Sequence, residues 1–416
     1  MKWMFLAFYL VCKLNVNAIL RFILQHTFRV TMASNFTCNE YEDRSVDFND
    51  QKVINKYLYT TSEQTVNQIL YPTLLASGII SNTLFLVVCA FSRQMHTTTN
   101  FYLANLALAD VTFLVIGLGE ELLQGRMSPI ENDASYIGKA GCIVVKFFSW
   151  FYYVASILIV TVVTADRYYA ICRPIPHQLG KSSTRTIKTA AVMWIAAFTV
   201  ASFSIPTYSY FEIYCAIWPD EEKFHGYPDE FAKCVTAIWW ATFVFQIVFV
   251  LFVQICLAAV LIMSMKILRK LHTRTQRSEQ SALSQQRSMK LRNHVAFMLT
   301  VNAIVFFLCQ APYQTTVFVE MVLTFMQCPS FCHNEVWNAW IWVAGILLYI
   351  NSVVNPIIYN LTNPQCRREF IRVLFTPCRR VRRFAESTNR GKNGDGEMYE
   401  ISSVVDVSDQ NMKDSS

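Results

Sequence analysis

The stretch VTADRYYAICRP, residues 163–174, follows directly on the apolar run FFSWFYYVASILIVTVV of residues 147–163. That run is apolar enough to lie in lipid, yet it is followed by an adjacent acid and base, Asp166 and Arg167. A helix needs about 20 residues to cross the hydrocarbon core of a bilayer. We therefore interpret the charged pair as the point at which a membrane-spanning helix reaches the membrane surface.

The rest of the chain contains more runs of the same kind. Of its 416 residues, 53% are hydrophobic and only 16% are charged, whereas a soluble domain carries about 25% charge. Lipid admits only helices and closed barrels, and these runs are too long and too uniform for barrel strands. We therefore predict an all-α membrane protein with a bundle of seven transmembrane helices. The predicted spans are 69–91, 100–123, 140–165, 187–208, 234–265, 293–323 and 336–359.

The orientation of the bundle follows from its lysines and arginines, which concentrate in cytoplasmic loops. They gather after the third predicted helix, between the fifth and sixth, and after the seventh, whereas acidic residues gather before the first and the fifth. The sequence thus predicts a multi-pass plasma-membrane protein with an extracellular N-terminus and a cytoplasmic C-terminus. The net charge of +7 reflects this topology, and we expect no nucleic-acid partner.

The chain divides into four predicted regions around this bundle. They are an extracellular N-terminal region (1–68), the bundle (69–360), an amphipathic eighth helix with a lipidation site on the inner leaflet (361–378) and a disordered cytoplasmic tail (379–416). Cys378 is a candidate for palmitoylation, which would anchor that helix to membrane lipids.

The N-terminal region carries two signals of export. Residues 1–18 contain a lysine followed by a short apolar run and resemble a cleaved signal peptide; the alternative is that translation begins at Met32. Asn35 lies in an Asn-Phe-Thr glycosylation sequence on the predicted outer side.

The cysteines on the outer side predict a disulfide. Cys142 lies at the outer mouth of the third helix and Cys215 in the loop between helices four and five. A Cys142–Cys215 disulfide would hold that loop over the bundle in the oxidising compartment. Cys234 is the competing partner, which we place at the start of helix five, farther from helix three.

Polar residues at mid-membrane depth are functional candidates because their burial is costly. One carboxylate, Asp110, is accompanied by hydroxyl and amide groups at the same predicted depth. Each group alone is explained by an interhelical hydrogen bond, but together they suit a monovalent cation such as sodium, or a water cluster. The members of this candidate sodium site are Asp110, Ser156, Asn351, Ser352 and Asn355.

Nearer the outer side, the predicted mouth of the bundle is acidic. Glu120, Glu121 and Glu320 face a single base, Lys146. An acid–base pair is the simplest interpretation, and it leaves a negative surplus that favours a cationic ligand. The other candidates for lining a ligand pocket are Ser149, Trp150, Tyr153, Tyr313, Gln314, Trp340, Trp342 and Tyr349.

The sequence resembles the rhodopsin-like (class A) G-protein-coupled receptors over about residues 65–378. The resemblance rests on six motifs in order, each on the expected helix. They are LANLALAD ending at Asp110, Cys142, the triplet Asp166–Arg167–Tyr168, Trp194, CQAPY at 309–313 and NPIIY at 355–359.

The resemblance implies how the chain would signal. Asp166 would hold Arg167 at rest, and an outward swing of helix six would expose Arg167 to a heterotrimeric G protein. The chain itself would not be an enzyme and would need no cofactor, although an allosteric Na⁺ is compatible with the family. Receptor kinase and arrestin would act at the tail. The implied coupling and activation residues are Asp166, Arg167, Tyr168, Phe306, Gln310, Pro312, Asn355, Pro356 and Tyr359.

Two departures from the family pattern concern helices five and six. Residues 234–265 lack the usual mid-helix proline, and Gln310 stands where a tryptophan is usual. The route from ligand to Arg167 is therefore expected to differ in detail.

The resemblance also narrows the ligand class. Ser149 replaces the aspartate of aminergic receptors, and Tyr349 replaces the retinal-binding lysine of opsins. The alternating stretch 210–224 predicts a hairpin in the second outer loop, which is similar to peptide receptors. We expect a basic or amidated neuropeptide; the alternatives are a lipid or small-molecule ligand, or a seven-helix transporter or channel, for which no internal repeat is seen.

Overall fold

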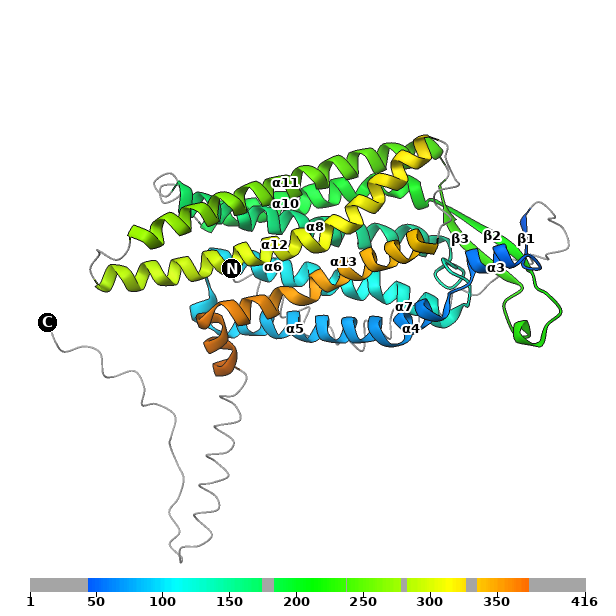
Figure 1. The fold of residues 1–416 in the computed structure, drawn as a ribbon, viewed down its shortest axis with the longest axis horizontal. Helices are drawn as coiled ribbons and strands as arrows, with labels where there is room; N and C mark the ends of the chain where they lie inside the picture. Colours follow the sequence, from blue (N-terminus) through cyan, green and yellow to red (C-terminus); the bar gives the residue numbers. More distant parts are fainter. Residues whose placement is uncertain (1–43, 174–182, 237, 278–282, 327–334, 374–416) are drawn as a thin grey trace, which may run out of the picture. The chain divides into compact units, whose positions relative to one another are not determined.

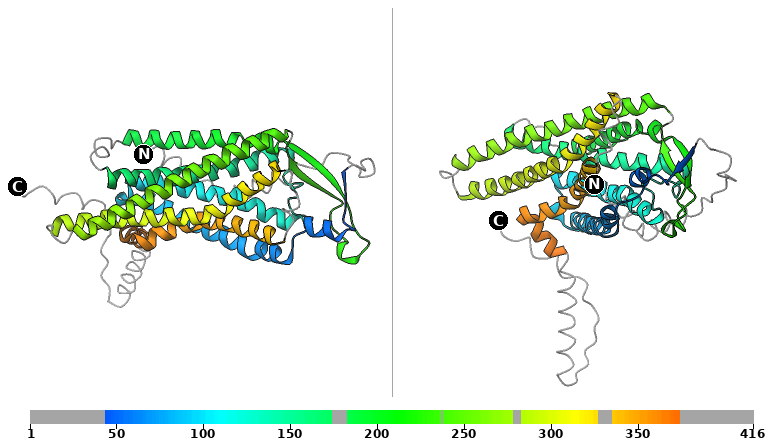
Figure 2. Two further views of the ribbon diagram at one scale, coloured as in Figure 1. Left: turned by 45° about the horizontal axis from the view of Figure 1, so that its top comes forward. Right: turned by 45° about the vertical axis from the view of Figure 1, so that its right-hand side comes forward.

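The computed structural model describes residues 44–173, 183–236, 238–277, 283–326 and 335–373. Within these ranges seven long helices run side by side, which confirms the predicted bundle (Figures 1 and 2). The predicted glycosylation site Asn35, the palmitoylation candidate Cys378 and the tail 379–416 lie outside the described residues.

The first two helices each contain a turn of π-helix. Helix one comprises α4 (Thr61–Thr65), η3 (Val66–Leu70) and α5 (Tyr71–Phe91), and helix two comprises α6 (Thr98–Phe113), η5 (Leu114–Leu118) and α7 (Gly119–Met127). The other five are α8 (Gly138–Cys172), α10 (Ser183–Ser202), α11 (Trp239–Arg277), α12 (Leu283–Phe325) and α13 (Glu335–Thr362). A further helical segment, 364–373, follows α13.

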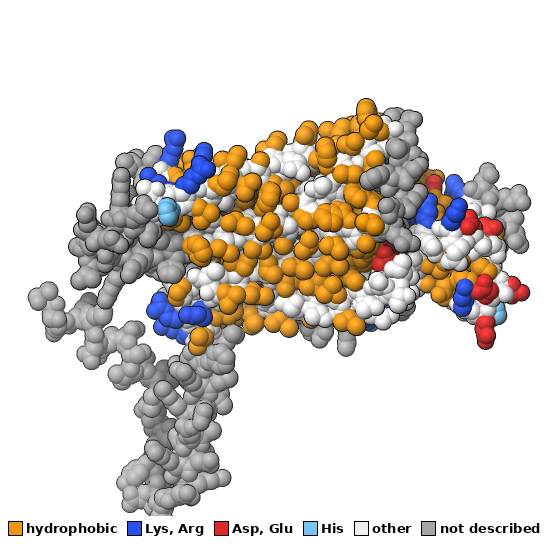
Figure 3. All heavy atoms as spheres, in the orientation of Figure 1, with side chains coloured by type: hydrophobic (Ala, Val, Ile, Leu, Met, Phe, Trp, Pro, Cys, Tyr) orange, Lys and Arg blue, Asp and Glu red, His pale blue; other side chains and the backbone are white. Residues whose placement is uncertain are grey.

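Six of these helices are long and apolar enough to cross a membrane. The exception is α10, which is long enough at 20 residues but less apolar, because it begins with hydroxyl side chains together with Arg185 and Lys188. Its packing against α8 and α6 nevertheless places it in the bundle. The apolar surface of the helices forms a broad band across the molecule (Figure 3), as expected for a multi-pass membrane protein.

Two helix boundaries differ from the predictions. Helix three does not end at the charged pair: α8 continues through Asp166 and Arg167 to Cys172. Helix five does not begin at Cys234, because residues Glu230–Val235 form strand β3 and α11 starts only at Trp239. Residues 230–235 pair with β2 in an antiparallel register and are therefore a strand; the predicted span had included its last two residues, Cys234 and Val235.

A small sheet covers one end of the bundle, here called the sheet end. Strands β2 (Tyr210–Ile217) and β3 form an antiparallel hairpin in which Phe211 faces Cys234, so the predicted hairpin is confirmed. A third strand, β1 (Ser45–Asp47), joins parallel to β2 with Ser45 opposite Cys215, which the sequence did not reveal. The order of the strands is β1-β2-β3.

The N-terminal segment 44–60 forms a cap on this sheet. Phe48 is fully buried and stacks on Trp218, with ring centroids 4.0 Å apart. Helix α3 (Gln51–Tyr57) follows, with the Asp50 side chain as its N-cap. A bridge between Leu58 and Ile130 then ties the segment to the loop after helix two. Burial of Phe48, Ile130 and Phe231 in one cluster therefore fixes the cap to two separate loops.

The two ends of the bundle carry opposite charge. Acidic side chains gather at the sheet end, whereas lysines and arginines gather at the other, here called the basic end (Figure 3). Exposed residues at the basic end include Arg185 and Lys188 on α10, and Arg269 and Lys270 on α11. This polarity matches the charge pattern from which the orientation was predicted.

Candidate ligand-binding pocket and switch residues

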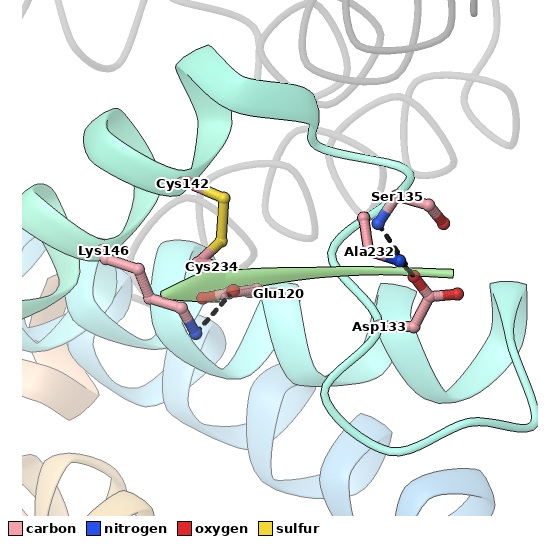
Figure 4. Close-up of a disulfide and its surroundings, with 7 residues drawn as sticks. All are labelled: Glu120, Asp133, Ser135, Cys142, Lys146, Ala232 and Cys234. Atoms are coloured by element: carbon pink, nitrogen blue, oxygen red, sulfur yellow. Dashed lines mark hydrogen bonds and ion pairs between the residues drawn. A yellow bond between two sulfur atoms is a disulfide. The ribbon is translucent and has the colours of Figure 1, made fainter. Parts of the chain in front are cut away.

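An ion pair lies inside the bundle near the sheet end. Lys146 of α8 reaches Glu120 of α7, with Nζ and Oε1 2.7 Å apart, and the two side chains are only 27% and 9% exposed (Figure 4). The predicted acid–base pair is therefore present. Among the described residues, Glu121 makes no ion pair of its own. The predicted negative surplus thus lies next to the pair.

The cap extends over this acidic region. Tyr59 is buried and contacts Trp342 of α13, with ring centroids 6.2 Å apart. In the loop after helix two, burial raises the pKa of Glu131 to about 7, with further contributions from the charges of Glu63 and Glu121. The carboxylates of Glu63 in helix one, Glu121 in helix two and Glu131 in this loop therefore repel one another, so a cation placed among them would be stabilised.

A continuous layer of aromatic rings lies below the ion pair and connects five helices. Tyr153 of α8 is near its centre and is almost fully buried. The successive ring-centroid distances are 6.1 Å for Trp342–Tyr71, 5.7 Å for Tyr71–Tyr349, 5.6 Å for Tyr349–Phe113, 5.8 Å for Phe113–Tyr153, 5.9 Å for Tyr153–Trp150 and 6.2 Å for Tyr153–Tyr313.

The structure thus brings together most of the predicted pocket residues. Trp150, Tyr153, Tyr313 and Tyr349 belong to the aromatic layer, and Ser149 lies close to Gly117 of helix two. Glu320 lies half-buried near the sheet end of α12. The carboxylates of this region therefore come from helices one, two and six and from the loop after helix two.

Three members of this region were not predicted from the sequence: Tyr59, Tyr71 and Phe113. Aromatic residues make up 14% of the chain, so one more aromatic in an apolar helix carries no signal of its own. Which of them face the bundle axis depends on the rotation of each helix. The π-turns η3 and η5 alter that rotation, and their positions are not evident from residue type.

Tyr153 also links helices three and six through hydrogen bonds. Its hydroxyl donates to Gln310 Oε1 at 2.6 Å and accepts from Gln314 Nε2 at 2.9 Å. All three side chains are buried, so these bonds are shielded from water. We call this arrangement the Tyr153 clasp. It places Gln310, the residue that departs from the family pattern, in a direct contact between the two helices.

Two polar atoms in and near the clasp lack hydrogen-bond partners among the described residues. Gln314 Oε1 and Ser149 Oγ are both buried and make no hydrogen bond to the described residues. Since unpaired buried polar atoms are costly, a water molecule or a polar ligand group in this region would stabilise them.

The mid-membrane polar residues form a cluster around Asp110. Ser156 Oγ donates to Asp110 Oδ1 at 3.0 Å, and Asn355 Nδ2 donates to Oδ2 at 2.7 Å. Ser352 also hydrogen-bonds to this carboxylate, and its backbone carbonyl accepts from Asn82 at 2.9 Å. Helices one, two, three and seven are thereby joined.

Two amide oxygens of the cluster have no hydrogen-bond partner among the described residues. Asn82 Oδ1 and Asn351 Oδ1 are buried and unpaired among the described residues, and the Asp110 side chain is fully buried. A hard cation such as Na⁺ prefers oxygen ligands of this kind. The donor set therefore fits a monovalent cation, although water would satisfy the same atoms.

Arg167 is restrained at the basic end. Its Nη2 lies 2.7 Å from Asp166 Oδ2 and also donates to Thr99 Oγ1 of α6. Tyr168 packs against the cluster formed by Ile171, Ile267 and Leu271, which joins α8 to α11. The expected resting pair of Asp166 and Arg167 is thus present in the structure.

Four further candidate switch residues lie in helices six and seven. Tyr359 and Phe306 are almost fully buried, and the Tyr359 ring lies 5.3 Å from that of Phe85 in helix one. Pro312 and Pro356 lie inside α12 and α13, which continue past them. Each proline removes one backbone donor, so these helices are weakest at those two points.

The predicted Cys142–Cys215 disulfide is wrong. Cys142 is bonded to Cys234, with Cα atoms 5.5 Å apart (Figure 4), and Cys215 is in a different disulfide. The reason is the hairpin: Cys234 lies in strand β3 rather than in helix five, and Cys215 pairs with Glu230 farther along the sheet. Asp133 reinforces the connection by accepting from the backbone N–H groups of Ser135 at 2.9 Å and Ala232 at 3.1 Å.

Comparison with known proteins agrees with this arrangement. The family model of the 7 transmembrane receptor (rhodopsin family) matches residues 81–359. The human neuromedin-U receptor 2 is 28% identical over 315 residues, which cover 74% of this chain and 71% of the receptor. A neuromedin U receptor homolog of Caenorhabditis elegans is 23% identical, covering 79% and 86%. The pyrokinin-1 receptor of Drosophila melanogaster is 25% identical, covering 74% and 79%.

The disulfide assignment can be tested by mass spectrometry. Proteolysis of the non-reduced protein should release a cross-linked peptide pair containing Cys142 and Cys234; a pair containing Cys142 and Cys215 would contradict the structure. Cys234→Ser should lower the free energy of unfolding by about 2–4 kcal/mol and reduce the amount at the cell surface. Cys256→Ser, at a buried free cysteine in α11, is the control and should leave the surface amount nearly unchanged.

Proposed function

Because the chain belongs to the rhodopsin family of seven-transmembrane receptors, we propose that it binds an extracellular neuropeptide and activates a heterotrimeric G protein. The sheet end would face the outside and the basic end the cytoplasm of a cell, with the receptor in the plasma membrane. The charge polarity of the bundle supports this orientation, since lysines and arginines favour the cytoplasmic side.

The ligand class is inferred mainly from one observation: the carboxylate of Glu121 lies beside the buried ion pair of Glu120 and Lys146. Glu120 is neutralised by Lys146, which leaves Glu121 to attract a cation from outside. A basic group on a peptide would meet both Glu121 and the carboxylates of Glu63 and Glu131. The similarity to receptors named for neuromedin U and pyrokinin supports a peptide over a lipid or small molecule, and a transporter or channel is disfavoured by the family match.

The signal would pass from the mouth to Arg167 through the bundle axis. A ligand that contacts the aromatic layer would act on Tyr153, whose hydroxyl holds α12 through Gln310 and Gln314. Loss of this clasp would free α12 to move at its weak point, Pro312. Ligand binding would thereby shift an existing equilibrium between two states, and release of Arg167 from Asp166 would complete the site for the G protein.

The cluster around Asp110 would add an allosteric Na⁺ to this scheme. The ion would be held by oxygen atoms of Asp110, Ser156, Asn351, Ser352 and Asn355, and its charge would offset that of the buried carboxylate. Because these residues join helices two, three and seven, an ion bound there would stabilise the resting arrangement.

Peptide recognition can be tested in intact cells. Amidated peptides with and without basic residues are added to the medium outside the cells, and nucleotide exchange on the G protein is measured. Because the peptides reach only the outer face, a response also tests the proposed orientation. We expect responses to basic peptides. Glu121→Gln should lower their potency roughly tenfold to a hundredfold, because a charge-assisted contact contributes about 1.5–3 kcal/mol.

The matched control for this experiment is Glu222→Gln, an exposed carboxylate on the same end of the molecule, which should respond like the unmodified receptor. Equal potency of Glu121→Gln and the unmodified receptor would refute the role of the acidic mouth. A response to neutral lipids alone would refute the peptide ligand.

The Tyr153 clasp predicts a basal-activity phenotype. Tyr153→Phe removes the hydroxyl that holds α12 and leaves two buried glutamines short of partners. Basal nucleotide exchange should rise several-fold, because a loss of about 1–2 kcal/mol in the resting state changes its population by that order. Tyr152→Phe, one residue away on the same helix, should have no such effect. Unchanged basal exchange together with a lower unfolding temperature would reduce the clasp to a structural role.

The sodium proposal predicts that Na⁺ weakens agonist binding. In membranes containing the receptor, replacing a large organic cation by Na⁺ at constant ionic strength should lower agonist affinity. Asp110→Asn should abolish that difference, because the variant lacks the carboxylate charge. The proposal fails if Asp110→Asn keeps the Na⁺ response of the unmodified receptor.

A further inference from the structure

A groove of about 500 Å³ opens between α8 and α10. It lies beside the lipid-facing surface of α10, where Val192 and Ile195 are 64% and 66% exposed. The groove is lined by Leu158, Val162, Thr184, Arg185, Lys188, Thr189, Val192, Met193 and Ala196. No part of the proposed ligand pocket or switch contributes to it.

The lining of this groove changes from cationic to apolar along its length. At the basic end, Arg185 and Lys188 lie three residues apart on α10 and therefore on one face of the helix. Both are exposed, and the Thr184 and Thr189 hydroxyls are beside them. Toward the middle of the bundle the lining becomes apolar, with Val192 and Ala196 facing Leu158 of α8. Cationic donors at one end and a hydrocarbon surface at the other are the features of an amphiphile site.

The length of the groove matches one leaflet of a membrane. From Thr184 to Ala196 is 12 residues, or about 18 Å of helix at 1.5 Å per residue. Half of a hydrocarbon core of about 30 Å is about 15 Å. A groove that begins at the membrane surface would therefore end near the bilayer midplane, which is the depth reached by a lipid chain.

We propose that this groove binds one anionic phospholipid of the inner leaflet. The Arg185 guanidinium and the Lys188 ammonium would bind the phosphate and the acidic headgroup, because both groups donate charge-assisted hydrogen bonds to such oxygens. One acyl chain would lie against Leu158, Val162 and Val192. The proposal rests on the orientation given under the proposed function, which places the basic end at the cytoplasmic leaflet, where anionic lipids concentrate.

The position of the groove gives the bound lipid a structural consequence. Val162 lies four residues before Asp166 on α8, so the chain would pack one turn from the restrained Asp166–Arg167 pair. On the other side, Trp194 of α10 donates to Asn105 of α6 at 3.1 Å. A lipid in the groove would therefore brace the contact between α10 and α8 close to the residues that bind the G protein.

Photo-cross-linking in nanodiscs tests the site directly. The purified receptor is placed in phosphatidylcholine nanodiscs that contain a minor fraction of a lipid with a diazirine in its acyl chain. The headgroup of this probe is either phosphoserine or phosphocholine, and cross-linked peptides are identified by mass spectrometry. We expect several-fold more cross-linking of residues 158–162 and 184–196 by the phosphatidylserine probe than by the phosphatidylcholine probe.

Two variants and one control locate the interaction. R185Q/K188Q should lower cross-linking by the phosphatidylserine probe to the phosphatidylcholine level, and V192W should lower it for both probes by filling the groove. R269Q/K270Q removes the same charge from exposed positions of α11 outside the groove and should keep the preference.

Equal cross-linking by both probes would overturn the proposal, because lipid that surrounds any membrane protein cross-links regardless of its headgroup. A headgroup preference that survives R185Q/K188Q, or that R269Q/K270Q also abolishes, would overturn it as well. The measurement uses no peptide and no G protein, and both leaflets of a nanodisc contain the probe. Failure of the proposed receptor function or orientation would therefore leave this result unaffected.

Discussion

A polypeptide in the hydrocarbon core of a membrane has no water to satisfy its backbone N–H and C=O groups. Each unsatisfied group costs several kcal/mol, so every span of this chain is a helix, and even Pro312 and Pro356 lie within continuous helices. Because the backbone is satisfied within each helix, only side chains remain to hold the helices in one arrangement or to allow another. The few polar side chains inside the bundle consequently carry most of its specificity.

Those side chains form two separate groups of hydrogen bonds, one among helices one, two, three and seven and the other between helices three and six. Asp110 and its amide and hydroxyl partners join helices one, two, three and seven. Close packing there also depends on Gly78, because a Cβ at this position would clash with the Leu114 side chain. Helix six is held to helix three by the Tyr153 clasp instead. Because Gln310 stands where a tryptophan is usual and the clasp consists of hydrogen bonds between buried side chains, the clasp is directional and is lost over a short displacement. Such a connection suits a helix that changes position.

The sheet end is organised by a different constraint. Beyond the apolar band the chain is not restricted to helices, so its loops have to be held in place by cross-links and buried side chains. The Cys142–Cys234 disulfide fixes the end of the hairpin to helix three, and the cap adds strand β1 to the other edge of β2. Burial of Phe48 against Trp218 then ties the N-terminal segment to the hairpin. The sheet end of the bundle is thereby bounded on two sides, and the charges of Glu63 and Glu121 act on the carboxyl group of Glu131 in the loop after helix two.

The sequence by itself determined the number of helices, the charge polarity of the bundle, the pair of Asp166 and Arg167, the cluster around Asp110 and the acidic mouth. Each depends on a local property, such as the length of an apolar run or a motif on one helix, that survives without knowledge of the neighbours. The tertiary structure alone decided the disulfide partner of Cys142, the addition of β1 to the hairpin, the members of the aromatic layer and the role of Gln310. These depend on which residues from distant segments meet. A strand at 230–235 moved Cys234 out of helix five and beside Cys142, and the rotation of each helix, altered by η3 and η5, selected which of many aromatic side chains face the axis.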